Sequence, residues 1–162
     1  MNHLPVLPEK DLERILRDYG DMLFRLCLVM LGNPADAEDA VQETMIRCYQ
    51  KAPRFRDPEH EKAWLLKVAA NLCRDQLRFR ARHPQVDIDS ITELAAESPD
   101  SGILEALMAL PEKFRLVLVM HYVEGYRVEE IAGIIGRTPS AVKMRLQKGR
   151  NLLKEHYRKE YM

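Results

Sequence analysis

The segment from Tyr126 to Leu153 constrains the fold more than any other part of this 162-residue chain. Apolar residues recur at helical spacing as far as Ile135, and Gly136 then supplies a residue that readily takes the positive φ of a helix C-cap. Thr138 is a favourable N-cap for a second helix, and Pro139 follows at its first position, where a missing N–H costs nothing. Two short helices joined by such a tight turn predict a helix-turn-helix unit.

The second helix of this pair is strongly basic. Residues 137–159 contain eight Lys or Arg side chains and one acidic side chain. If Val142 marks the buried face, the side chains that project outward or to the flanks are Ser140, Lys143, Met144, Gln147 and Lys148. A helix docked in the major groove would place such side chains on base edges and neighbouring Arg and Lys on phosphates. A solvated basic face is the alternative for a lone helix, and the turn in front of this one favours DNA binding.

Charge is segregated along the chain, although the formal net charge is zero. Residues 9–43 hold nine acids and four bases, residues 47–82 hold ten bases and four acids, and residues 85–112 hold seven acids and no base. Residues 83–102 also contain Pro, Ser and Gly, which is typical of a linker. We therefore expect an all-α protein of two small helical domains, residues 1–82 and 103–162, joined by an acidic linker at 83–102.

The sequence offers no pattern typical of an enzyme, a metal site or a membrane span. No nucleophile–base pair or phosphate-binding loop is present, and the five His residues lack metal-ligand spacing. Cys27, Cys48 and Cys73 are odd in number and widely separated, which suits reduced core thiols. The first residues do not read as a signal peptide, and the apolar runs are too short to cross a bilayer. We expect a cytoplasmic protein without cofactor, metal, catalytic activity or membrane insertion of its own.

A helix that begins after Asn33, with Pro34 at its first position, pairs an apolar stripe with an acidic face. The face opposite the stripe holds Asp36, Asp39, Glu43, Ile46 and Gln50. Acids in the first turn favourably meet the helix dipole, and that role together with solubility explains most of them. An isoleucine within the face also fits a docking surface for a basic partner. The residues alone therefore leave two interpretations open, a solvated acidic face and a docking surface.

A third helix, from about Pro58 to Arg82, carries a basic stripe beside aromatic rings. The stripe comprises Lys67, Asn71, Arg74 and Arg78, with Trp64 at its border and Phe55 just upstream. Cations beside aromatic rings suit single-stranded nucleic acid, because the backbone meets charge while unpaired bases stack on the rings. Core packing of the rings with a solvated basic face explains the same pattern equally well.

Taken together, these segments resemble the extracytoplasmic-function sigma factors of bacterial RNA polymerase. Residues 36–44, DAEDAVQET, are similar to the polymerase-binding helix of that family's region 2. Residues 63–65, AWL, and 70–72, ANL, resemble the promoter-melting segment of the same region. Region 4 is matched by LPE at 110–112, EEIA at 129–132 and VKMR at 142–145. The two sets occur in family order and cover roughly residues 10–155.

The resemblance implies a subunit that directs promoter-specific transcription initiation and is not itself an enzyme. It implies that the clamp helices of the largest polymerase subunit would contact Asp36, Asp39, Gln42 and Glu43. The −10 element would be contacted by Arg56, Asp57, His60, Trp64, Lys67, Asn71, Arg74 and Arg78, and the loop at residues 56–60 would capture one flipped base. The −35 element would be contacted by Arg137, Ser140, Lys143, Met144, Arg145, Gln147, Lys148 and Arg150. The implied partners are core RNA polymerase, promoter DNA and an anti-sigma factor.

The sequence leaves open a competing function and the reason for one glycine. An autonomous helix-turn-helix regulator with an N-terminal partner domain is the competing function, although a neutral chain with acidic segments has little long-range attraction for DNA. Gly149 lies in the middle of the basic helix that forms the second half of the helix-turn-helix. A glycine there lowers the stability of the helix by about 0.5–1 kcal/mol relative to Ala. A close approach of that helix to DNA or to a partner would explain this glycine, and so would simple tolerance.

Overall fold

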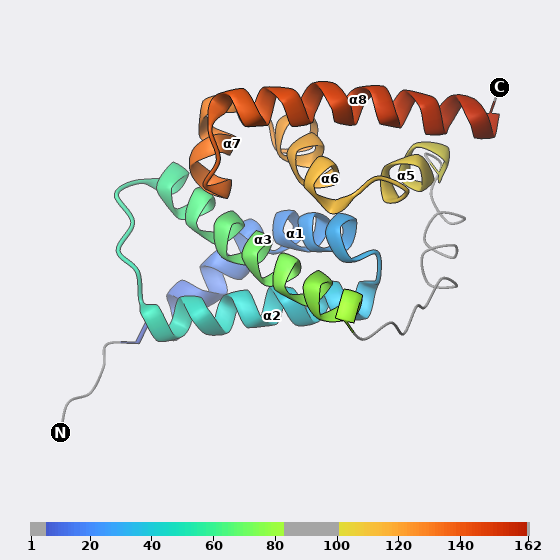
Figure 1. Ribbon diagram of the computed structural model, residues 1–162. Coiled ribbons are helices and arrows are strands. Elements are labelled where there is room, and N and C mark those ends of the chain that lie inside the picture. Colours follow the sequence, from blue (N-terminus) through green and yellow to red (C-terminus); the bar gives the residue numbers. More distant parts are fainter. Residues whose placement is uncertain (1–5, 83–100, 162) are drawn as a thin grey trace.

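The computed structural model describes residues 6–82 and 101–161, and within these two ranges all regular secondary structure is helical (Figure 1). The expected all-α class is thereby confirmed. Most of the predicted acidic linker, residues 83–100, lies outside the described residues. We refer to helices α1–α3 as the N-terminal half and to helices α5–α8 as the C-terminal half.

The N-terminal half consists of α1 (Glu9–Leu31), α2 (Pro34–Lys51) and α3 (Pro58–Arg82). The turn between α1 and α2 follows the local signals in the sequence. Gly32, at φ 73°, ends α1 and donates its N–H to the Leu28 carbonyl, while Asn33 Oδ1 accepts the N–H of Ala35 at 2.8 Å. The apolar faces of the three helices meet in a buried core that includes Leu23, Leu26, Ala37, Leu65 and Leu66.

A bidentate ion pair holds α3 on α1. The two terminal nitrogens of Arg14 donate to the carboxylate of Glu61 at 2.9 and 2.8 Å, and Glu61 is buried. These hydrogen bonds lower the pKa of Glu61 and outweigh burial, which acts in the opposite direction. The position of α3 therefore depends on a charged pair as well as on apolar packing.

The C-terminal half consists of α5 (Ser101–Met108), α6 (Glu112–Leu118), a π-helical turn η1 (Val119–Val123), α7 (Val128–Ile135) and α8 (Pro139–Tyr161). Gly136, at φ 70°, ends α7 and donates its N–H to the Ala132 carbonyl. Thr138 Oγ1 accepts the N–H of Ala141 at 3.1 Å and so caps the start of α8. The predicted helix-turn-helix is confirmed as the pair α7–α8.

Gly149 allows α8 to lie close to α6. A Cβ atom at this position would stand 3.2 Å from Leu118 Cδ1 and 3.4 Å from Phe114 Cβ, tighter than ordinary van der Waals contact. Since the neighbour is another helix of the same chain, intramolecular packing accounts for the glycine in the middle of the basic helix.

The two halves pack against each other and share one apolar core. The guanidinium of Arg115, on α6, is buried and donates to the carbonyls of Met30 at 2.7 Å and of Leu110 at 2.5 Å. A second link joins Arg25 on α1 to Glu124, at 3.2 Å, and only 4% of the Glu124 side chain is exposed. In Figure 1, α6 and α7 lie between α8 and the N-terminal half, and α2 lies on the side away from α8.

Candidate partner and nucleic-acid interfaces

The acidic face of α2 is open to solvent. Asp39, Gln42 and Glu43 are exposed, and so is Ile46, with 46% of its surface accessible. An ion pair between Glu43 and Arg47, at 3.6 Å, lies on the surface and contributes little to stability. Three of the four residues predicted to contact polymerase therefore form one continuous, accessible face.

Asp36, the fourth of these residues, has a different environment. It is half-buried, and its carboxylate accepts a hydrogen bond from Arg80 near the end of α3. Arg80 also donates to the Leu31 carbonyl at 2.7 Å, at the last residue of α1. Asp36 thus helps to join α2 to the other two helices of the N-terminal half, a contact that helical spacing alone did not indicate.

The turn into α3 brings together Arg56, Asp57 and His60, three residues of the segment that the family resemblance predicts to capture a base. The backbone N–H of His60 donates to Asp57 Oδ1 at 2.7 Å, so Asp57 caps the first turn of α3. His60 Nδ1 in turn accepts the N–H of Arg56 at 3.2 Å. The Phe55 ring packs edge-on against His60 at 5.5 Å and against Trp64 at 5.7 Å between ring centroids. These contacts order the loop as a small network of hydrogen bonds and rings.

The stripe along α3, which we call the α3 face, comprises Trp64, Lys67, Asn71, Arg74 and Arg78. Lys67, Asn71 and Arg78 are exposed, and Arg78 forms a surface ion pair with Asp75 at 3.7 Å. Trp64 and Arg74 are half-buried. Burial lowers the pKa of Arg74, and the positive charges of Arg145 and Arg137 act in the same direction, against the carboxylate of Glu112. The packing of the two halves therefore brings cations predicted for both promoter elements into electrostatic contact.

Helix α7 lies against the α3 face. A hollow of about 380 Å³ between the two halves is lined on one side by His60, Trp64 and Lys67, and on the other by Glu129, Glu130 and Ile134. Backbone and side-chain hydrogen bonds with Arg127 lower the pKa of Glu130, and the charge of Lys62 on α3 adds a smaller effect. Lys62 also lies over the Tyr126 ring, 5.0 Å from its centroid. Carboxylates of one half thus face cations of the other.

The outer surface of α8 and the turn before it are open. The exposed residues among those predicted to contact the −35 element are Arg137, Ser140, Lys143, Met144, Gln147 and Lys148. Met144 is strongly exposed, with 71% of its surface accessible. Arg145 and Arg150 are half-buried, and Arg150 donates to the hydroxyl of Tyr122 at 3.0 Å. The exposed set, which we call the α8 face, fits a helix that presents polar side chains and one methionine to a groove.

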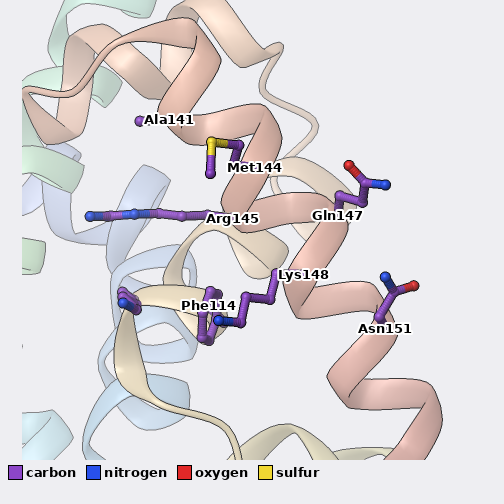
Figure 2. A pocket seen from close by; sticks show the side chains of 8 residues that line it. Phe114, Ala141, Met144, Arg145, Gln147, Lys148 and Asn151 are labelled. Carbon is purple, nitrogen blue, oxygen red and sulfur yellow. The ribbon is translucent and has the colours of Figure 1, made fainter.

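A shallow hollow of about 450 Å³ lies along the α8 face (Figure 2). Gln147 and Asn151 point to the same side of α8, and the Lys148 side chain runs down toward the ring of Phe114 on α6. Lys113 and Phe114 complete the lining from outside the helix-turn-helix. Sequence reasoning missed Asn151, which follows Gln147 by one helical turn, and the two α6 residues, whose proximity depends on tertiary packing.

The described part of the chain contains no group of three or more Cys, His, Asp or Glu side chains that could hold a metal ion. No helix in that part is long and apolar enough to cross a membrane. Cys27, Cys48 and Cys73 are buried free thiols, as expected, and burial raises the pKa of Cys48 to about 11.

Models of two sigma-factor regions match the chain in order. The Sigma-70 region 2 model matches residues 15–83, and the Sigma-70 region 4 model matches residues 101–153. The ECF RNA polymerase sigma factor SigL of Mycobacterium tuberculosis is 32% identical, over 85% of this chain and 84% of SigL. The ECF RNA polymerase sigma factor SigE of Mycolicibacterium smegmatis is 29% identical over 91% of this chain, and the match spans 62% of SigE.

A solved structure shares the fold. The sigma factor RpoE from Bartonella quintana, in complex with the anti-sigma factor NepR, superposes with a TM-score of 0.74 over 92% of this chain and 98% of that one, at 22% identity. Two region models in family order and a relative above 30% identity over most of its length lead to one conclusion: the chain belongs to the extracytoplasmic-function (ECF) sigma factors of RNA polymerase.

Proposed function

We propose that this protein binds core RNA polymerase through Asp39, Gln42 and Glu43 on α2 and directs promoter-specific transcription initiation. In this role the α3 face contacts the −10 element, and the α8 face reads the −35 element. The protein supplies promoter choice, the catalytic step belongs to the polymerase, and the site of action is the cytoplasm.

One observation supports this role above all others. The accessible acidic face of α2 lies on the side of the N-terminal half away from α8, whose outer surface is basic (Figure 1). A basic protein partner and DNA could therefore be bound at the same time without competing for one surface. A regulator that acts on DNA alone would have no evident use for an exposed acidic face with an isoleucine in it.

Charge also supports dependence on a partner. The net charge is zero, and acidic stretches flank the basic helices. Because phosphate neutralisation provides most non-specific affinity for DNA, we expect the free chain to bind DNA weakly until polymerase occupies the acidic face. An anti-sigma factor is a further proposed partner, since the solved relative RpoE was captured with one.

The test is a charge reversal on α2. We expect Asp39→Lys combined with Glu43→Lys to abolish co-purification with core polymerase and promoter-specific transcription in a reconstituted assay, because two repulsive charges would face the basic partner. Both side chains are exposed, so the helical circular dichroism spectrum should be retained.

The matched control is Glu13→Lys combined with Asp21→Lys, which reverses two exposed acids on α1 and should leave polymerase binding intact. Unchanged co-purification of the α2 variant would reject the docking surface. Tight sequence-specific DNA binding by the free wild-type chain would instead favour an autonomous regulator.

A further inference from the structure

The ring of Phe114 on α6 holds two lysines that belong to different helices. Lys113 Nζ lies 5.1 Å from the ring centroid, and Lys148 Nζ, from α8, lies 5.8 Å from the same centroid. Phe114 is 4% exposed, whereas both lysines are exposed. A ring fixed in the core therefore positions two ammonium groups at one edge of the α8 hollow through cation–π attraction.

This arrangement gathers two positive charges around one ring without a counterion. Within residues 6–82 and 101–161, neither lysine forms an ion pair with a carboxylate. Each ammonium group is available to an anion, and an anion that contacts both would gain two favourable charge interactions. The pair is therefore arranged for an anionic group that arrives from outside.

The surroundings of the pair favour a nucleic-acid phosphate as that anion. Both lysines line the same hollow as Met144, Gln147 and Asn151, on the outer side of the second helix of the helix-turn-helix. A side chain on a neighbouring helix meets the DNA backbone beside a recognition helix, whereas base edges lie in front of it.

We propose that Lys113 is a DNA-contacting residue outside the helix-turn-helix, which together with Lys148 clamps one backbone phosphate across Phe114. This inference rests on the proposed DNA-binding role of α8. It moves Lys148 from base reading to backbone anchoring and leaves sequence choice to Lys143, Met144 and Gln147. The footprint on DNA thereby extends from α8 to α6.

The experiment uses the full chain assembled with core polymerase. A promoter duplex is first selected by this holoenzyme from a randomised library, and a second duplex carries a scrambled upstream element. Binding of both duplexes is measured over a series of salt concentrations. Lys113→Ala should reduce the magnitude of the negative slope of log K against log salt by about 0.9, the value for one phosphate contact, and should weaken both duplexes equally.

Two variants serve as controls. Lys113→Arg keeps the charge and should retain the wild-type slope, and Lys10→Ala removes an exposed lysine on α1 and should also leave the slope unchanged. An unchanged slope for Lys113→Ala would overturn the inference and leave an acidic protein segment as the occupant of the site. A loss confined to the selected sequence would also overturn it, by making Lys113 a base contact. If the wild-type holoenzyme selected no sequence at all, the proposed function itself would fail.

Discussion

The α3 face and the α8 face have similar chemistry but different accessibility. Both combine cations with polar or apolar side chains at helical spacing. On the α8 face, Lys143, Met144 and Gln147 are exposed. On the α3 face, Trp64 and Lys67 share a hollow with the carboxylates of α7, and Arg74 is half-buried.

Of the two proposed DNA-binding surfaces, the α8 face is therefore available in this arrangement, whereas the α3 face is partly covered. The part of the α3 face next to α7, at Trp64 and Lys67, becomes fully accessible only if α7 moves away from it. The links that oppose such a movement include the shared apolar core, the Arg115 hydrogen bonds, the Arg25–Glu124 ion pair and the α3–α7 contact. Trp64 is the only tryptophan of the chain and borders the hollow, so its fluorescence can report the separation.

The largest expected effect comes from Arg115→Ala. The guanidinium donates to the Met30 carbonyl in one half and to the Leu110 carbonyl in the other, and its removal leaves buried acceptors without a donor. We expect the free energy of unfolding in urea to fall by about 2–4 kcal/mol. Quenching of Trp64 by acrylamide should rise before the main transition, because the two halves separate first.

Arg25→Ala is the comparison for that variant. Arg25 is half exposed and forms one ion pair, whereas the buried Arg115 donates to several carbonyls. The loss of Arg25 should therefore cost less and expose Trp64 less, even though it leaves the Glu124 carboxylate without its partner. Arg115→Ala could instead unfold in a single step, with Trp64 no more accessible than in the wild type. The two halves would then not separate before unfolding, and the different accessibility of the α3 and α8 faces would have no functional consequence.

A smaller effect is expected at the contact that holds α3 on α1. Because the pKa of Glu61 in the folded protein is lowered below its unfolded value of about 4.3, its ion pair stabilises the fold above that pH. This contribution should be lost as the pH falls through the folded pKa. We expect Glu61→Gln to cost about 1–3 kcal/mol at pH 7 in urea titrations, and the difference from wild type to shrink as the pH is lowered below 4.3.

The matched control is Glu130→Gln on α7, a partly exposed carboxylate whose pKa is also lowered. Its partner Arg127 is exposed, so the cost should be smaller at every pH. A difference between Glu61→Gln and wild type that stayed constant down to pH 3 would show that the Arg14 pair does not anchor α3.

Local signals predicted much of this structure, and tertiary packing decided the rest. The caps at Gly32, Asn33, Gly136 and Thr138 depend on a few neighbouring residues, so the sequence suffices to locate these helix ends. The exposed acids of α2 and the exposed side chains of α8 also follow from helical spacing. Gly149 was ambiguous, because the reason for it is the proximity of Leu118 on another helix.

The dependence on tertiary packing also explains which residues of the candidate sites were missed. Asp36 cannot be distinguished from its acidic neighbours in the sequence. Its structural role depends on the hydrogen bond that it accepts from Arg80 on another helix. Lys113 lies in a helix that helical spacing assigns to the core, and its place beside Lys148 depends on how α6 meets α8. The covering of α3 by α7 is a relation between segments about sixty residues apart, which periodicity does not describe.

The smallest expected effect concerns the charges that face each other across the hollow. Glu129→Lys places a cation on the α7 side, opposite Lys67, where a carboxylate stood before. Both positions are exposed, so the change should weaken the free energy of the contact between α3 and α7 by only about 0.5–1 kcal/mol. We expect this as a modest rise in the acrylamide quenching of Trp64 at low salt. The rise should fade at 1 M salt, where the Debye length is about 3 Å.

Glu155→Lys, on the exposed surface of α8, makes the same charge change away from the hollow and should leave quenching unaltered. Equal quenching in both variants would mean that α7 covers α3 through apolar contact alone, so that the accessibility of the α3 face would not respond to salt.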